Sequence, residues 1–133
     1  RLLHMVSESA EIITGAFLNL PAVCNFLIRE HKHVVLGCSA WKDRFNLEDT
    51  LFAGAVVSVV DEAFSINCDS SRIAETLYKK ARRDMYEFMK NNNASHYHRL
   101  TNFGLERDIR HCLTPDLANV LPEYVNGKLV VQK

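Results

Sequence analysis

The sequence lacks three features that would assign a protein to a broad class at once. No apolar run approaches the roughly 20 residues that a membrane-spanning helix requires. The formal net charge is zero, because 16 basic residues balance 16 acidic ones, so no general nucleic-acid or anionic-membrane surface is expected. The four cysteines are far apart in the sequence, and none forms a Cys-x-x-Cys pair. We therefore expect reduced thiols in a cytoplasmic protein.

The chain does have the length and composition of a globular domain. Of its 133 residues, 47% are hydrophobic and 24% are charged, which is enough to bury a core. It begins at Arg1 rather than at a methionine, and Leu2, Leu3 and Val6 already have helical spacing. We expect either a single domain over residues 1–133 or the C-terminal half of a larger one, from a longer or a cleaved chain.

Strand-like and helical segments alternate along the first half of the sequence. A buried strand is predicted over residues 12–17, followed by a helix that Asn19 caps and that ends near His31. A second strand is predicted over 34–36, and a buried helix from Leu47 to about Phe64. Gly54 in that helix predicts close approach of the helix to a sheet. This alternation predicts an α/β fold, with helices on the faces of a sheet.

The second half is predicted to be mostly helical. A long amphipathic helix begins at Asp69 or Ser70 and ends near Lys90, and two short helices cover 94–100 and 105–113. Asn126 and Gly127 then separate two strand-like runs, which predicts a C-terminal hairpin.

The stretch from His33 to Ser58 is the best candidate for a ligand site. Its predicted strand ends at Gly37 and Cys38, a polar loop follows, and the next helix opens with two carboxylates. Ligands of α/β proteins lie at the carboxyl ends of strands, and a helix N-terminus favours phosphate. The sequence therefore predicts a site for a small anion here.

Cys38 and Arg44 have the Cys-x5-Arg spacing of cysteine-dependent phosphatases, in which a thiolate attacks phosphorus and an arginine binds the oxygens. The loop between them has no glycine, however, and it contains bulky Trp41 and Phe45 where a phosphate-binding loop needs small residues. The alternative is that Cys38 is a small buried hydrophobic residue at the end of the strand.

Glu48 and Asp49 allow two interpretations. They could bind Mg²⁺, which prefers one or two carboxylates with water and phosphate oxygens, or one could act as a base. Alternatively, Asn46 and Asp49 form a capping box at the helix start. Adjacent helical positions diverge by about 100°, so at most one of the two carboxylates is expected to face the site.

The remaining titratable residues have weaker signals. The pairs His31/His33 and His96/His98 have no third ligand at a zinc-like spacing, so they are interpreted as surface or helix-end histidines. Asp108 opens a predicted helix, where a cap or an ion pair is the simpler interpretation.

Four blocks of the sequence resemble the 2-phosphosulfolactate phosphatase (ComB) family. They are Asn-Leu-Pro-Ala-Val at 19–23, Gly-Cys-Ser-Ala-Trp-Lys-Asp-Arg-Phe-Asn-Leu-Glu-Asp-Thr-Leu-Phe-Ala-Gly-Ala at 37–55, Gly-Leu-Glu-Arg-Asp-Ile-Arg-His-Cys at 104–112 and Val-Leu-Pro at 120–122. The resemblance covers nearly the whole chain but only about the later half of a family member. It implies a three-layer α/β/α fold with a mixed sheet and the C-terminal hairpin, completed by a missing N-terminal part.

The resemblance also implies a function. Family members are Mg²⁺-dependent phosphatases that hydrolyse 2-phospho-3-sulfolactate to sulfolactate and phosphate, a step of coenzyme M biosynthesis. By position, Glu48 and Asp49 would be catalytic and, with Asp108, would bind the metal. The substrate would be bound by Asn19, Cys38, Lys42 and Arg44. The expected partners are the small phosphorylated substrate and either the chain's own N-terminal half or further copies of itself. A cysteine-dependent phosphatase and a non-catalytic anion-binding α/β module are the alternatives.

Overall fold

The computed structural model describes residues 2–6, 11–42 and 44–131. Its elements are α1 (Leu2–Met5), the 3-10 helix η1 (Phe17–Asn19), α2 (Leu20–Glu30), α3 (Leu47–Val60), α4 (Asp69–Ala81), α5 (Met85–Asn91), α6 (Ser95–Thr101), α7 (Glu106–Cys112), β1 (Pro122–Val125) and β2 (Lys128–Val131). Within these ranges, no helix is both long enough and apolar enough to cross a membrane. The described part is therefore a mixture of helices and a small antiparallel sheet, as an α/β composition predicts.

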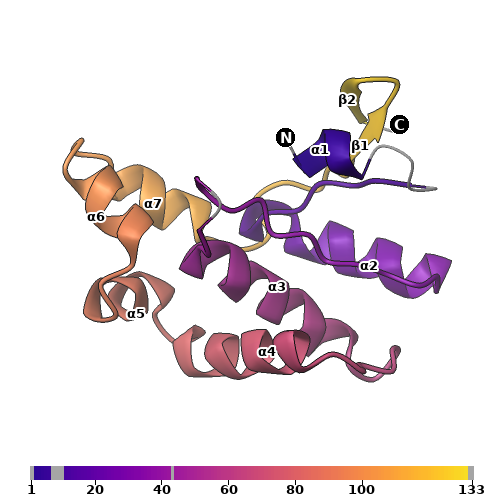
Figure 1. The fold of residues 1–133 in the computed structure, drawn as a ribbon, viewed down its shortest axis with the longest axis horizontal. Helices are drawn as coiled ribbons and strands as arrows, with labels where there is room; N and C mark the ends of the chain where they lie inside the picture. The colour runs from indigo at the N-terminus through magenta and orange to yellow at the C-terminus, as the bar shows by residue number, and fades with distance from the viewer. Residues whose placement is uncertain (1, 7–10, 43, 132–133) are drawn as a thin grey trace.

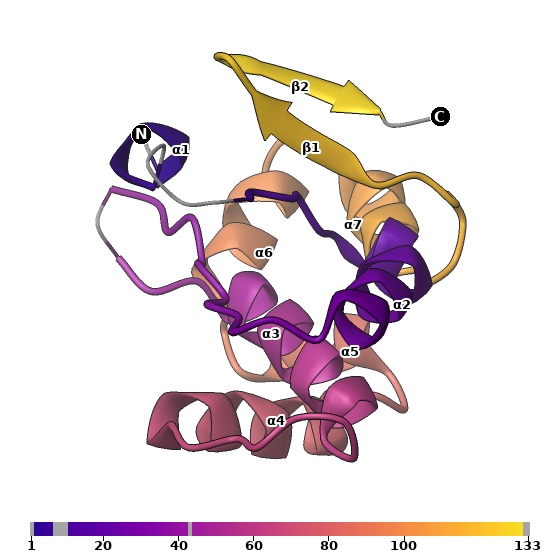
Figure 2. The same ribbon diagram turned by 90° about the vertical axis from the view of Figure 1, so that its right-hand side faces the viewer.

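Helix α3 is the centre of the fold. It lies between α2 and α4, while the hairpin and α4 lie at opposite ends of the molecule (Figures 1 and 2). Its side chains are apolar nearly all round, and Leu51, Ala55 and Val56 are fully buried. Such a helix needs cover on several sides, and α2 and α4 supply two of them.

Gly54 allows α4 to approach α3 closely. A Cβ atom at this position would lie 2.0 Å from the carbonyl oxygen of Ala74 in α4. The sequence correctly predicted a close approach at Gly54, but it assigned the approach to a sheet, and the partner is a helix. The pattern of one helix cannot identify the element that covers it.

The predicted long helix over 69–90 is interrupted. Helix α4 ends at Ala81, and α5 begins at Met85 after Asp84, whose side chain accepts a hydrogen bond from the backbone N–H of Glu87 at 2.9 Å. An aspartate that bonds the backbone in this way favours a new helix start over helix continuation. The other predicted helices agree with the structure to within a few residues at each end.

The predicted C-terminal hairpin is confirmed. Strands β1 and β2 pair antiparallel, with Val125 opposite Lys128. Asn126 and Gly127 both have positive φ angles, of 50° and 82°, and a two-residue loop with this geometry matches the twist of a hairpin.

The chain also closes on itself near its two ends. The backbone N–H of Tyr124 donates to the carbonyl of Ile12 at 2.8 Å, and that of Thr14 donates to the carbonyl of Pro122 at 2.9 Å. Leu18 accepts two further hydrogen bonds, from the backbone N–H groups of residues 117 and 118. Residues 12–14 therefore lie beside β1, and they do not form a regular strand.

The two strands predicted over 12–17 and 34–36 are not formed. Residues 12–14 make only an isolated bridge, between Ile13 and Glu123. Residues 33–36 run extended across the face seen in Figure 1 and pair with no strand of the described part. A strand needs a partner for its backbone N–H and C=O groups, and no described segment pairs with these residues. As a result, Val35 is 95% exposed.

Candidate active site

The loop that precedes α3 folds back onto the first turn of that helix. Asp49 Oδ2 accepts hydrogen bonds from Ser39 Oγ at 3.2 Å and from the backbone N–H of Ala40 at 3.1 Å. Trp41 and Arg44 exchange two backbone hydrogen bonds, which close a tight turn. Ala40 and Lys42 have positive φ angles, of 59° and 52°. Such backbone strain in residues other than glycine is concentrated at functional sites.

The predicted capping box is not formed. Asn46 precedes α3 and is buried, but its side chain makes no capping hydrogen bond. Asp49 is directed to residues 39 and 40 instead of to its own helix end. The interpretation of Asp49 as a cap is therefore wrong in its geometry, because the carboxylate joins the loop to the helix.

Glu48 contacts a different element from its neighbour. Its Oε1 atom pairs with Nδ1 of His96 in α6, and the side chains of Glu48 and His96 are only 24% and 17% exposed. The ring of His96 also meets the edge of Trp41, with ring centroids 5.8 Å apart. His96 lies in the first turn of α6, as the helix-end interpretation predicted, but it is largely covered rather than on the surface. No local signal could have found this contact, because it depends on the packing of α6 against α3.

The protonation of His96 follows from this environment. Burial of the ring, and next the guanidinium of Arg99, lower the pKa of His96, although the carboxylate of Glu48 favours the protonated ring. Both Nε2 of His96 and Oε1 of Glu48 are buried and have no hydrogen-bond partner in the described part of the chain.

Cys38 lies in the loop but has the wrong electrostatics for a nucleophile. Desolvation, and next the carboxylate of Asp49, raise the pKa of its thiol, whereas cysteine nucleophiles have lowered pKa values. The residue is exposed overall, so the alternative prediction of a buried cysteine was also wrong. Cys38 follows the unpaired segment 33–36, and no sheet of the described part covers it.

Lys42 and Arg44 both belong to the tight turn. The ammonium nitrogen of Lys42 lies 4.5 Å from the centroid of the Trp41 ring, and the guanidinium carbon of Arg99 lies 4.7 Å from the same centroid. Arg44 is exposed. Arg99 was not among the predicted site residues, and like His96 it comes from α6.

Asn19 is used within the fold. Its Oδ1 atom accepts from the backbone N–H of Ala16 at 2.8 Å, and its Nδ2 atom donates to the carbonyls of Thr14 and Val120 at 3.2 and 3.0 Å. The residue is 6% exposed. These contacts tie the start of α2 to the segment before β1.

The predicted metal ligands are only partly brought together. Glu48 and Asp49 share the first turn of α3, whereas Asp108 is exposed in the first turn of α7. Across residues 2–6, 11–42 and 44–131, no three His, Cys, Asp or Glu side chains are grouped closely enough to hold a metal ion. The described chain thus offers two neighbouring carboxylates, not a complete metal-binding set.

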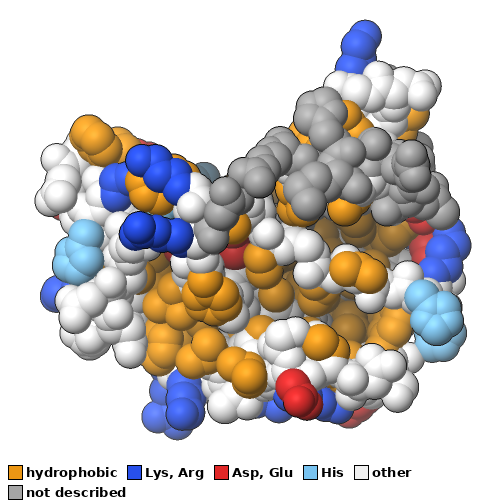
Figure 3. Space-filling model, in the orientation of Figure 1, with side chains coloured by type: hydrophobic (Ala, Val, Ile, Leu, Met, Phe, Trp, Pro, Cys, Tyr) orange, Lys and Arg blue, Asp and Glu red, His pale blue; other side chains and the backbone are white. Residues whose placement is uncertain are grey.

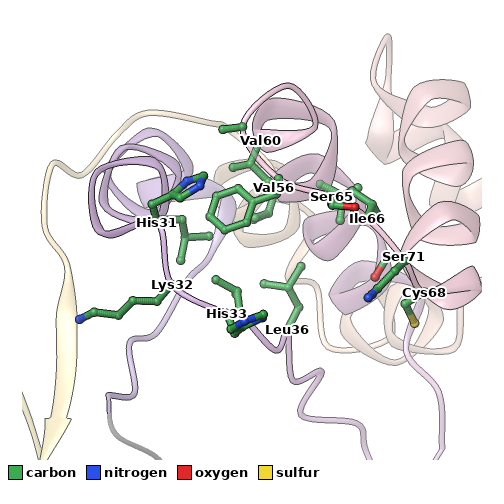
Figure 4. Close-up of a pocket in the computed structure, with 16 residues that line it drawn as sticks. His31, Lys32, His33, Leu36, Val56, Val60, Ser65, Ile66, Cys68 and Ser71 are labelled. Atoms are coloured by element: carbon green, nitrogen blue, oxygen red, sulfur yellow. The ribbon is translucent and has the colours of Figure 1, made fainter.

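A groove of about 510 Å³, lined by both polar and apolar side chains, lies beside the unpaired segment 33–36 (Figure 4). One wall is formed by α2 and α3, with Leu27, Val56 and Val60, and another by Leu36. Figure 3 shows that apolar side chains gather across the middle of this face of the molecule. The thiol of Cys68 lies at one end of the groove.

Comparison with known proteins identifies the family. The model of a family described as 2-phosphosulpholactate phosphatase matches residues 1–127. The chain belongs to this family. A probable 2-phosphosulfolactate phosphatase of Thermotoga petrophila is 36% identical over 126 residues, which are 95% of this chain and 53% of the relative. Proteins of the same description from Synechocystis and Clostridium perfringens are 33% and 30% identical, over 95% and 97% of this chain and 53% and 51% of the relatives.

The chain therefore spans about half the length of the curated 2-phosphosulfolactate phosphatases that it matches. This agrees with the resemblance seen in the sequence blocks.

Proposed function

We propose that this chain is part of a cytoplasmic, Mg²⁺-dependent phosphatase that hydrolyses 2-phospho-3-sulfolactate, or a similar small anionic phosphomonoester, to sulfolactate and phosphate. The family membership and the names of the relatives support the reaction class. The four cysteines are all free, which agrees with a reducing compartment.

The observation that carries this proposal is the divergence of Glu48 and Asp49. Asp49 fixes the loop through Oδ2, while Glu48 turns to His96. The two carboxylates contact different elements, Asp49 the loop and Glu48 helix α6. A phosphomonoester bound beside the start of α3 would meet acidic and basic groups together.

Mg²⁺ fits this arrangement as a partly protein-bound ion. It commonly takes one or two carboxylates and completes its shell with water and phosphate oxygens, and Glu48 and Asp49 can supply those carboxylates. When bound, the ion would stabilise negative charge on the phosphoryl oxygens. Asp108 joins the proposal only by resemblance, since it is not grouped with the other two in the described structure.

The residues of this chain would orient and bind the substrate. Asp49 holds Ser39 and Ala40 against the start of α3 through two hydrogen bonds. These bonds fix the position of the loop relative to the helix. Glu48 contacts the ring of His96, whose Nε2 atom is buried. Lys42, Arg44 and the thiol of Cys38 would contact the anionic groups of the substrate.

We further propose that the fold is completed to three α/β/α layers with a mixed sheet by polypeptide equivalent to the rest of the relatives' length. The supporting observations are the extended, exposed segment 33–36 and the groove beside it. An unpaired strand edge favours the addition of another strand. Association of several copies of this chain is the alternative way to cover the same surface.

The test measures phosphate release from 2-phospho-3-sulfolactate by the chain together with the unmatched portion of the Thermotoga petrophila relative. We expect release to require Mg²⁺, to survive Cys38→Ser, and to fall by about 100-fold or more in Asp49→Asn, as for a positioned catalytic carboxylate. Glu62→Gln, which alters an exposed carboxylate beyond α3, is the matched control and should leave the rate unchanged.

Two outcomes would contradict this proposal. Loss of activity in Cys38→Ser with indifference to EDTA would favour a cysteine-dependent phosphatase, despite the raised pKa of that thiol. Absence of turnover even with the complementary polypeptide would favour a non-catalytic module that keeps the fold and binds an anion.

A further inference from the structure

Glu48 and Asp49 are adjacent in the sequence, but different parts of the molecule hold their carboxylates. Asp49 Oδ2 accepts hydrogen bonds from the hydroxyl of Ser39 and from the backbone N–H of Ala40, both in the loop before α3. Oε1 of Glu48 contacts the ring of His96 in α6. Side chains at adjacent helical positions diverge by about 100°. The two carboxylates therefore keep one arrangement only while the loop and α6 keep theirs.

Trp41 joins this loop to α6. Among the described residues from 37 to 45, it is the one that is partly buried, and the others are exposed. The centroid of its ring lies 5.8 Å from that of His96, in an edge contact, and 4.7 Å from the guanidinium carbon of Arg99. His96 and Arg99 are three positions apart on α6, so they lie on the same face of that helix. The backbone of Trp41 is fixed separately, by two hydrogen bonds with Arg44.

These contacts form a closed circuit, because α6 also contacts Glu48. Starting at Asp49, the circuit passes through the loop to Trp41, continues to His96, and returns to Glu48, the residue before Asp49. Helix α6 is a firm support in this circuit, since Tyr97 is only 8% exposed and its hydroxyl lies 3.4 Å from that of a tyrosine in α5. The packing of the Trp41 ring is therefore the contact that ties the exposed loop to a fixed helix.

The same circuit contains buried polar atoms that lack a hydrogen-bond partner. In the part of the chain that the structure describes, they are Oε1 of Glu48, Nε2 of His96 and Nε of Arg99. Unpaired buried polar groups are unfavourable for stability, and in native proteins each needs a specific explanation, such as a catalytic role. Contacts that served only to stabilise the fold would pair these atoms. The three atoms therefore favour a functional reason for the packing of α6 against the start of α3.

We propose that Trp41 is a positioning residue for the reaction, because its packing on α6 holds the contacts of Asp49 and Glu48 in one arrangement. Trp41 acts through these two carboxylates and does not need to touch the substrate. Without the indole, both carboxylates would remain on α3, but the loop and α6 would move independently, and the reacting geometry would be populated less often. The effect on phosphate release rests on the proposed function, whereas the coupling of the loop to α6 does not.

The coupling is tested on the 133-residue chain without metal or substrate, because Trp41 is its single tryptophan. Acrylamide quenching of Trp41 emission measures the access of solvent to the indole. We expect the quenching constant to rise by about twofold in Asp49→Ala and in His96→Ala, as for the loss of one aromatic contact. Glu62→Ala, which removes an exposed carboxylate beyond α3, is the control. An unchanged constant in either circuit variant would overturn the coupling.

The positioning role is tested by phosphate release from 2-phospho-3-sulfolactate with the complementary polypeptide. In Trp41→Leu we expect kcat to fall by about tenfold while KM changes by less than about twofold, because substrate still binds but the reacting geometry is rarer. Trp41→Phe keeps an aromatic ring against α6, so it should retain kcat to within about threefold. Phe45→Leu is the matched control, because Phe45 belongs to the same loop and is 72% exposed. It should leave both parameters unchanged.

The outcomes separate this proposal from the proposed function. Mg²⁺-dependent release with an unchanged kcat in Trp41→Leu would retain the activity and reject the positioning role. A rate that falls only in proportion to the folded fraction, measured by circular dichroism, would also reject it, because Trp41 would then act on stability alone. Absence of release from the unmodified chain would reject the proposed function, and the quenching results would then decide the coupling by themselves.

Discussion

At the scale of single residues, the four free cysteines differ in their surroundings. Cys24 is buried in α2, and burial raises the pKa of its thiol to about 11. Cys68 precedes α4, where a hydrogen bond with Ser70 Oγ at 2.9 Å and the backbone N–H groups of residues 70 and 71 lower its pKa to about 7. A thiolate is stabilised at a helix N-terminus in this way.

We predict that Cys68 is the thiol that iodoacetamide labels fastest at neutral pH. About half of an acid with a pKa of about 7 is ionised at pH 7, whereas Cys24 and Cys38 stay protonated because their pKa values are raised. The rate should rise as pH increases from 6 to 8 and then level off. Mass spectrometry of peptides after timed labelling measures this.

The control for this prediction is Ser70→Ala, which removes the hydrogen bond with the largest effect on the thiol. The labelling rate of Cys68 at pH 7 should then fall by about threefold or more. Equal labelling of Cys68 and Cys38 in the unmodified chain would show that the helix start does not activate the thiol.

Residue-level reading of the sequence located one half of the candidate site. Glu48, Asp49 and Lys42 belong to a single continuous stretch, and their types and spacing identified them. His96 and Arg99 could not be identified, because they reach the site only through the packing of α6. Asn19 was predicted as a helix cap, but its amide joins segments separated by 101 positions, which local patterns do not reveal.

At the scale of elements, the contact between α3 and α4 depends on Gly54, which has no side chain. The backbone of α4 occupies the space where residue 54 would have its Cβ atom, 2.0 Å from the carbonyl oxygen of Ala74. Backbone cannot rotate away as a flexible side chain can, so the two helices would have to separate.

We therefore predict that Gly54→Ala destabilises the chain by about 3 kcal/mol, the upper part of the range for overpacked cores, although alanine favours helices more than glycine does. The measurement is urea unfolding followed by circular dichroism. Ala53→Gly is the matched control in the same turn, and it should cost only about 1 kcal/mol. A Gly54→Ala protein as stable as the parent chain would contradict the close packing of α4.

Elements with local causes were predictable, and elements with distant causes were not. The hairpin follows from Asn126 and Gly127, and helices α2 and α3 follow from their apolar patterns and starts. The strand-like residues 34–36 have the right composition, but composition cannot supply the neighbouring strand that pairing requires. The break before Met85 depends on one side-chain hydrogen bond of Asp84. The helical spacing of the apolar residues on both sides of Asp84 does not reveal this hydrogen bond.

At the scale of the whole molecule, the unpaired segment exposes apolar side chains beside the groove. Val34 and Leu36 are 40% and 36% exposed, and Val35 is 95% exposed. Exposed apolar surface of this kind usually marks an interaction site. The relatives, at about twice the matched length, have additional chain that could cover it.

We predict that Val35→Lys weakens association with the unmatched portion of the Thermotoga petrophila relative by about tenfold, because a charge replaces an apolar side chain at the interface. The stability of the chain alone should change by less than about 0.5 kcal/mol, since this side chain is already in water. Isothermal titration calorimetry measures the association, and thermal unfolding measures the stability.

Ile73→Lys serves as the control, because Ile73 is also apolar and 59% exposed, but it lies on α4. It should leave association unchanged. Equal weakening by both variants, or none by either, would mean that residues 33–36 do not contact the complementary polypeptide.

The hydrogen bonds between the first and last segments have a consequence for the order of folding. Thr14 and Pro122 are 108 positions apart, whereas α3 and α4, and α5 to α7, contact near neighbours in the sequence. Distant contacts form more slowly, because the entropy of closing a long loop is lost before the contact is gained. During synthesis, the helical middle of the chain can therefore assemble on the ribosome. Residues 12–19 can make their hydrogen bonds only after the segment around Pro122 has emerged.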